Sequence, residues 1–111
     1  MPDLTTTTHD GAGQVVLSVR GEIDLASAEE VRADLQRALQ ETGRRLVVDL
    51  RDVSFLDSTG LALLLRLNRQ AHESGRELVV VKGPPHVQRV FALTGASELL
   101  TMLDRIPVDG G

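Results

Sequence analysis

Four consecutive residues, Asp57-Ser58-Thr59-Gly60, bring a carboxylate, two hydroxyls and a glycine to a point where the sequence pattern changes. Residues 46–50 before them form a short, mostly apolar run that suits a buried strand. Residues 61–71 after them are rich in leucine and free of proline, as in a helix of three turns. A strand that leads into a helix is half of a βαβ unit, and open α/β sheets usually place their working residues at such a junction. The Ser58 hydroxyl is therefore the leading candidate functional group.

The same four residues also have a purely structural interpretation. Asp, Ser and Thr are preferred helix N-caps, because their side-chain oxygens accept hydrogen bonds from free N–H groups of the first turn. One cap would suffice, however, and Gly60 inside that turn costs roughly 0.5–1 kcal/mol relative to alanine. Such a glycine is useful only where another backbone or a partner must approach closely. The residues alone leave both interpretations open.

Other chemistry finds little support in the sequence. Ser58 lacks the Gly-x-Ser-x-Gly surroundings of a hydrolytic serine, and the three histidines lie in unrelated segments without the spacing of metal ligands. The chain has no P-loop and no Gly-x-Gly-x-x-Gly after a strand. Glu22 and Asp24 could form an acid/base pair, but carboxylates in loops are far more often solvated. We expect a protein that is not an enzyme and that holds no cofactor or metal.

Composition restricts the possible partners. The 111 residues suit one domain, 1–111, and the absence of cysteine excludes disulfides and thiolate metal sites. Direct nucleic-acid binding is not expected, because the net charge is −4 and only two residues, Phe55 and Phe91, are aromatic. Membrane insertion is not expected either, because the apolar runs are far shorter than the ~20 residues needed to cross a bilayer. The N-terminus lacks the basic region of a signal peptide, so we expect a cytoplasmic protein.

Periodicity and turn residues give the order of the elements. Strands are predicted over residues 4–9, 15–19, 45–50, 77–82 and 98–103, and helices begin near Ser27, after Asp57 and at Pro85. This order predicts an α/β sandwich with a mostly parallel central sheet, an antiparallel N-terminal edge strand and helices packed against it. Residues 21–25 are expected to form a loop, and residues 104–111 a frayed tail.

Helix ends carry their own signals. Ser27 and Glu30 have the spacing of a capping box at the start of the first helix, and Gly43 is expected to end that helix in a left-handed conformation. Gly95 is expected to stop the third helix. In the second helix the apolar stripe is unusually wide, which indicates burial on more than one side or a surface that meets a partner.

Three motifs in this order resemble those of STAS domains, and among them the bacterial anti-sigma factor antagonists. The motifs are Gly21-Glu22-Ile23-Asp24-Leu25-Ala26-Ser27-Ala28, Leu46-Val47-Val48-Asp49-Leu50 and Phe55-Leu56-Asp57-Ser58-Thr59-Gly60-Leu61. The resemblance spans roughly residues 14 to 103. It departs from the family at the C-terminus, where members commonly add an amphipathic helix, for which residues 104–111 are too short and too rich in glycine.

The resemblance implies a partner-switching function. In this family the serine that follows the aspartate, here Ser58, is phosphorylated by the anti-sigma factor, which is itself a serine kinase. The unmodified form binds that partner and frees a sigma factor, and a protein serine phosphatase restores it after phosphorylation. By the same resemblance Asp24 lies beside the phosphoacceptor, and Asp24, Asp57, Ser58, Thr59 and Gly60 form the partner-binding surface.

The physics of the junction agrees with such a switch. A phosphoserine carries roughly −1.5 to −2 charges, which a helix N-terminus tolerates, whereas like charges across an interface cost several kcal/mol. Two other functions stay open. One is a STAS subunit of a lipid transporter or a stress-sensing complex that is not switched by phosphorylation. The other is a nucleotide-binding module that uses the helix N-terminus at Ser58 as its anion site.

Overall fold

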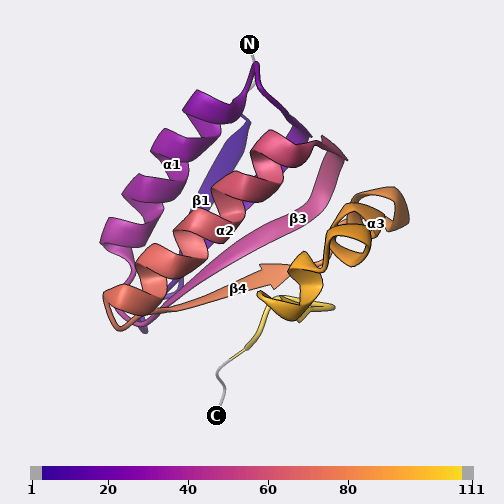
Figure 1. Ribbon diagram of the computed structural model, residues 1–111. Coiled ribbons are helices and arrows are strands. Elements are labelled where there is room, and N and C mark those ends of the chain that lie inside the picture. The colour runs from indigo at the N-terminus through magenta and orange to yellow at the C-terminus, as the bar shows by residue number, and fades with distance from the viewer. Residues whose placement is uncertain (1–3, 109–111) are drawn as a thin grey trace.

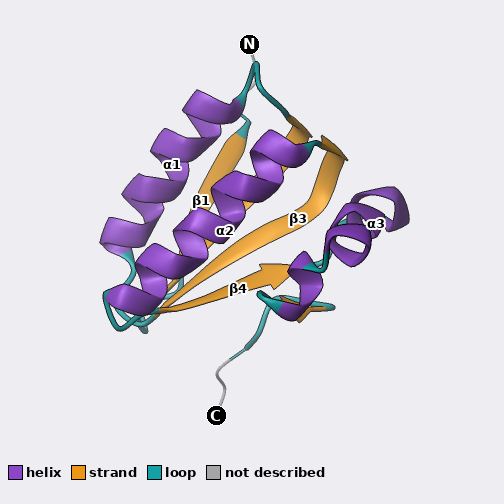
Figure 2. Cartoon of the chain, viewed as in Figure 1, coloured by secondary structure: helices purple, strands orange, loops and turns teal. Residues whose placement is uncertain are grey.

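The computed structural model describes residues 4–108 and contains a five-stranded sheet in the order β1-β2-β3-β4-β5 (Figures 1 and 2). The strands are β1 (Thr5–His9), β2 (Gln14–Ile23), β3 (Arg45–Leu56), β4 (Glu77–Val81) and β5 (Thr101–Leu103). The helices are α1 (Ala28–Glu41), α2 (Ser58–Glu73) and α3 (Pro85–Thr94), with a short 3₁₀ helix η1 (Ala96–Glu98). Only β1 is antiparallel to its neighbour, because β1 and β2 form a hairpin while helices connect the later strands. The predicted fold class is confirmed.

One face of the sheet carries the main core. Alternate residues of the three central strands, such as Leu17, Val48 and Val80, are fully buried on this face. The helices α1 and α2 lie side by side across it (Figure 2) and contribute Leu35, Leu64 and others to the same cluster. The wide apolar stripe of α2 is therefore largely core, since Leu61, Leu63, Leu64 and Leu67 are all buried.

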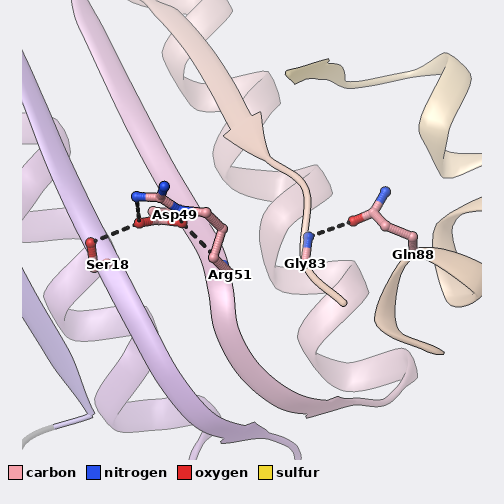
Figure 3. Close-up of polar contacts among 5 residues, drawn as sticks. All are labelled: Ser18, Asp49, Arg51, Gly83 and Gln88. Atoms are coloured by element: carbon pink, nitrogen blue, oxygen red, sulfur yellow. Dashed lines mark hydrogen bonds and ion pairs between the residues drawn. The ribbon is translucent and has the colours of Figure 1, made fainter. Parts of the chain in front are cut away.

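The opposite face carries a smaller apolar cluster and a polar one. Val16, Val47 and Val79 are paired across neighbouring strands and buried there. Two register positions further, on the same face, Ser18 and Asp49 are also paired (Figure 3). The Asp49 carboxylate accepts hydrogen bonds from the Ser18 hydroxyl at 3.2 Å and from the Arg51 Nε at 2.9 Å.

Two strands are longer than the sequence analysis predicted. The ladder between β2 and β3 continues to the pair Ile23 and Leu56, so part of the predicted loop at residues 21–25 belongs to a strand. Register shifts after Ser18 and after Gly21 interrupt the regular alternation, and exposed polar residues follow Leu50, so the apolar pattern ends before the strands do. At the other end of the chain β5 begins only at Thr101, because Ala96–Glu98 forms η1.

The predicted helix-end signals hold only in part. Ser27 is the N-cap residue of α1, as predicted, but its side chain makes no cap hydrogen bond, because its hydroxyl donates to the Glu22 carbonyl oxygen at 2.7 Å instead. Gly43 is not left-handed, and the chain leaves α1 at Thr42 in an extended conformation. A side chain at residue 43 would lie 3.2 Å from the Gly13 Cα, so this glycine serves a close chain crossing. The left-handed stop at Gly95 is confirmed.

The segment after β5 also differs from the prediction. Ile106 packs against the smaller apolar cluster, and the Pro107 carbonyl oxygen accepts a hydrogen bond from the Gln14 side-chain amide at 3.2 Å. A frayed tail is therefore not seen at Ile106 and Pro107, whereas Val108 is exposed. Residues 109–111, which the prediction included, lie outside the described residues.

Candidate functional site

The junction between β3 and α2 divides its tasks between neighbouring residues. Asp57 is the N-cap, and its carboxylate Oδ1 accepts hydrogen bonds from the backbone N–H of Thr59 at 2.9 Å and of Gly60 at 3.1 Å. Ser58 is the first residue of the helix, and its side chain is exposed. Within residues 4–108 the Ser58 hydroxyl has no hydrogen-bond partner. Because Asp57 alone satisfies the cap, the Ser58 hydroxyl is left available for chemistry.

Gly60 allows the end of β2 to pack against this junction. A Cβ at residue 60 would lie 2.8 Å from the Ile23 carbonyl oxygen and 2.6 Å from the Leu56 Cδ1, which is too close for any side chain. The same Ile23 carbonyl oxygen accepts a hydrogen bond from the Asp57 backbone N–H at 3.3 Å. The glycine is therefore required by a close backbone approach, one of the two reasons that the sequence suggested. Since Gly60 is buried, it shapes the site by placing these segments.

The loop after β2 brings Asp24 to the same edge of the sheet. Asp24 directly follows Ile23, which contacts Asp57, so the two loops begin side by side. The Asp24 Oδ1 accepts a hydrogen bond from the Ser27 backbone N–H at 3.0 Å, and the Ser27 hydroxyl lies 3.3 Å from it. The Ser27 backbone N–H bond, with further bonds from neighbouring groups, holds the pKa of the Asp24 carboxyl below its usual range. Asp24 is thus a half-buried carboxylate that orders its own loop and stays ionised at neutral pH.

A shallow hollow of about 470 Å³ lies beside Ser58, between α1 and α2. We call it the α1–α2 groove. Its lining includes Ser58, Thr59, Ala28, Ala62, Arg32 and Arg66. Thr59 is half-buried and Ser58 exposed at one end. Asp24 does not line this groove, and the acidic residue that does is Glu29.

The described part of the chain offers neither a metal site nor a membrane-spanning helix. No three His, Asp or Glu side chains in residues 4–108 lie close enough together to hold a metal ion. None of the helices in that range has both the length and the apolarity that crossing a membrane requires.

The arrangement of sheet, junction and loop agrees with a family comparison. A family model described as Mlab, STAS domain matches residues 7–103. The chain belongs to the STAS domain family. The resemblance inferred from the three motifs is therefore confirmed.

Individual STAS proteins show how far the similarity extends. The anti-sigma-B factor antagonist of Staphylococcus aureus is 31% identical over 98 residues, which cover 88% of this chain and 89% of that protein. A crystal structure of an anti-sigma factor antagonist from Mycobacterium paratuberculosis is 30% identical, with a TM-score of 0.81 and coverage of 96% of this chain and 91% of that one. The phosphorylated form of the Bacillus cell fate determinant SpoIIAA has a TM-score of 0.68 at 22% identity, with coverage of 91% and 92%, and this likeness shows the fold alone.

The structure of this STAS domain brings some predicted site residues together and adds others. Asp57, Ser58, Thr59 and Gly60 form one turn, and the loop with Asp24 is fixed beside it. Sequence reasoning missed the groove arginines because it interpreted the polar face of the first helix, which includes Arg32, as solvated and did not consider Arg66 at all. The signal was present in part, since Arg66 stands eight residues after Ser58, on the same side of α2.

Proposed function

We propose that this STAS domain is an anti-sigma factor antagonist controlled by phosphorylation of Ser58. In its unmodified form it binds an anti-sigma factor with serine kinase activity and so releases a sigma factor. Phosphorylation ends the binding, and a protein serine phosphatase restores it. The observation that carries this proposal is an exposed serine hydroxyl, unused by the helix cap, at the junction of a chain whose relative from Staphylococcus aureus is named an anti-sigma-B factor antagonist.

The chemistry asked of this chain is modest. The Ser58 Oγ attacks the γ-phosphoryl group of ATP held by the partner, forming a new P–O bond as the bond to ADP breaks, and the hydroxyl proton is released. An exposed hydroxyl with no internal partner can enter a kinase site without breaking a bond of the fold. Asp57 keeps the backbone of the turn rigid, so the hydroxyl is presented in a fixed place.

The charge of the product explains why binding would end while the fold persists. A phosphoserine at a helix N-terminus meets the positive end of the helix dipole, which favours the modified fold. A bound partner meets the same charge at a desolvated surface beside Asp57 and Asp24, where like-charge contacts cost several kcal/mol. About 1.4 kcal/mol corresponds to a tenfold change in affinity. A penalty of two or three times this size lowers the affinity roughly 100- to 1000-fold and so abolishes binding.

Exposed apolar side chains near the junction support a protein as the partner. Leu25, in the loop with Asp24, is 78% exposed, and Phe55, three residues before Ser58, is 47% exposed. Glu22 and Phe55 are register partners, so the two loops leave neighbouring strands at the same edge of the sheet. Exposed apolar side chains surrounded by polar residues are a feature of protein-interaction surfaces.

The decisive experiment is phosphorylation by the anti-sigma factor kinase that the proposal names as the partner. Mass spectrometry after incubation with ATP should find one phosphate on the wild type, none on Ser58→Ala, and one on the control Thr59→Ala. The Ser58→Ala variant should still bind the kinase. Phosphate uptake by Ser58→Ala equal to the wild type would overturn the assignment of Ser58. Absence of both uptake and binding in the wild type would favour a STAS subunit that is not switched.

A further inference from the structure

The α1–α2 groove is built from side chains that repeat at intervals of one helical turn on both helices. The two helices run side by side in the same direction, because each follows a strand of the parallel pair β2 and β3 (Figure 1). A hydrogen bond from the Gln36 side-chain amide to the Gln70 side-chain carbonyl joins them. Residues four apart lie on the same side of a helix. Arg32 and Arg66 therefore face each other one turn before this glutamine pair.

Toward the helix N-termini the groove is lined by small side chains. One further turn up stand Ala28 and Ala62, which leave open space between the helices. One more turn along α2 stands Ser58 itself. Ser58, Ala62 and Arg66 thus form a single row, with the serine at one end and the arginine at the other.

The two arginines differ in how they are held. Arg32 is engaged by Glu29 on its own helix, with its Nε 3.0 Å from the Glu29 Oε2. Arg66 has neither an ion pair nor a hydrogen bond within residues 4–108, and its side chain is exposed. Long side chains on a helix point back toward its N-terminus, which for Arg66 is the direction of Ser58. The Cα atoms of these residues are about 12 Å apart along the helix axis, a span that an extended arginine and a phosphoserine can close between them.

We propose that the α1–α2 groove is the seat of the phosphoryl group on Ser58, held there by Arg66 and, across the groove, by Arg32. This inference rests on the proposed phosphorylation of Ser58 and names what the phosphate meets in this molecule. An arginine guanidinium forms charge-assisted hydrogen bonds with phosphate oxygens, often two at once. The floor of alanines gives the phosphate room. Glu29 and Asp57 oppose it, so Arg32 must turn from Glu29 to the phosphate.

A phosphate held in the groove would block partner binding in a second way, in addition to charge repulsion. In the unmodified protein the groove is open to a partner. In the modified protein the phosphate occupies the end of the groove beside Ser58, and the positive charge of Arg66 is neutralised. A partner then meets an occupied groove, and a phosphatase has to draw the phosphate out of it.

The test uses protein with phosphoserine encoded at position 58 during synthesis, so that it does not depend on any kinase. Titration by ³¹P NMR measures the second pKa of the phosphate in the wild type, in Arg66→Gln, in Arg32→Gln and in the matched control Arg69→Gln. Arg69 is on the same helix but lines a different hollow, beside Leu99. A nearby cation favours the dianion, so the second pKa should be lower in the wild type and Arg69→Gln than in Arg66→Gln, by about half a unit or more. Arg32→Gln should show a smaller rise.

Equal second pKa values in the wild type and Arg66→Gln would overturn the seat. Thermal melting of the four unmodified proteins checks that each variant folds, since exposed arginines contribute little to stability. The two proposals fail separately. Failure of the kinase to phosphorylate Ser58 would overturn the proposed function but not the contact between the encoded phosphoserine and Arg66. A second pKa that does not change in Arg66→Gln would overturn only the proposed phosphate position in the groove.

Discussion

At the scale of single residues, the junction answers a question that the sequence left open. Asp57-Ser58-Thr59-Gly60 could have been a plain helix start or a presented site, and the structure assigns different residues to the two tasks. Asp57 caps the helix with one carboxylate oxygen, and Gly60 admits the backbone of β2. Ser58 does neither, and its hydroxyl makes no hydrogen bond within the described residues.

This division of tasks predicts unequal costs for two neighbouring substitutions. Asp57→Ala removes both side-chain bonds to the first turn and should lower the free energy of unfolding by about 0.5–2 kcal/mol. Ser58→Ala removes no bond within the described residues and should stay within about 0.5 kcal/mol of the wild type. Urea denaturation of the three proteins measures both. A larger loss in Ser58→Ala than in Asp57→Ala would show that the hydroxyl is part of the cap.

Gly60 offers the sharpest steric prediction. Gly60→Ala places a methyl group against the Ile23 carbonyl oxygen, a backbone atom that cannot turn aside. Overpacking of this kind costs about 1–3 kcal/mol, which exceeds any gain in helix propensity. Gly75→Ala is a useful comparison, because a methyl group there meets open space and only the left-handed φ of 74° is unfavourable for alanine. If Gly60→Ala melted at the wild-type temperature, the close approach of β2 to α2 would be wrong.

At the scale of elements, the sequence predicted the order and kind of the elements better than their ends. Buried strands such as β4 are continuous apolar runs, so their positions could be inferred directly. The extensions of β2 and β3 could not, because bulges break the alternation and the paired residues there are partly exposed. Ser27 was correctly predicted as the N-cap residue of α1, but the expected side-chain cap bond is absent. Its hydroxyl bonds to Glu22 in the preceding strand, a contact that no local spacing reveals.

The loop between β2 and α1 carries a prediction about binding. Leu25→Ser should weaken binding to the kinase, because Leu25 is exposed beside the junction and would lose its apolar contacts with a partner. Truncation of an interface anchor typically costs more than about 1 kcal/mol, or at least fivefold in affinity. The matched control is Leu93→Ser, since Leu93 is 79% exposed but lies on α3. Calorimetric titration compares them, and equal affinities for Leu25→Ser and Leu93→Ser would place the partner elsewhere.

At the scale of the whole molecule, the fold could be predicted from sequence while the groove could not. The α1–α2 groove depends on which residues of two helices face each other, and this is set by the packing of both helices into the shared core and by the register of β2 on β3. The apolar periodicity of a single helix predicts neither of these features. Asp57 to Gly60, by contrast, are consecutive, so the sequence alone pointed to them. Sites within one turn are therefore easier to predict than sites assembled between elements.

The face of the sheet opposite α1 and α2 supplies a prediction about the stability of the entire domain. Asp49 is almost fully buried there, where it bonds to Arg51 and Ser18 and ties β3 to β2 (Figure 3). Burial alone would raise the pKa of its carboxyl, but the bonds from Arg51 and Ser18 outweigh burial and hold it below the usual value. The ionised form is therefore favoured by folding. Its contribution is complete above the unfolded pKa, near 4, and is lost as the pH falls through the lower folded value.

Asp49→Asn should accordingly be destabilised most at neutral pH. We expect a loss of about 1–2 kcal/mol at pH 7, because the ion pair with Arg51 is removed. The difference from the wild type should shrink as the pH falls below about 4, since the wild-type carboxylate is then neutralised as well. Asp104→Asn is the control, because its pairing with Lys82 is exposed and worth little at any pH. Denaturant titrations at pH 7 and pH 3 measure both, and an equal loss at the two pH values would mean that the Asp49 charge does not stabilise the sheet.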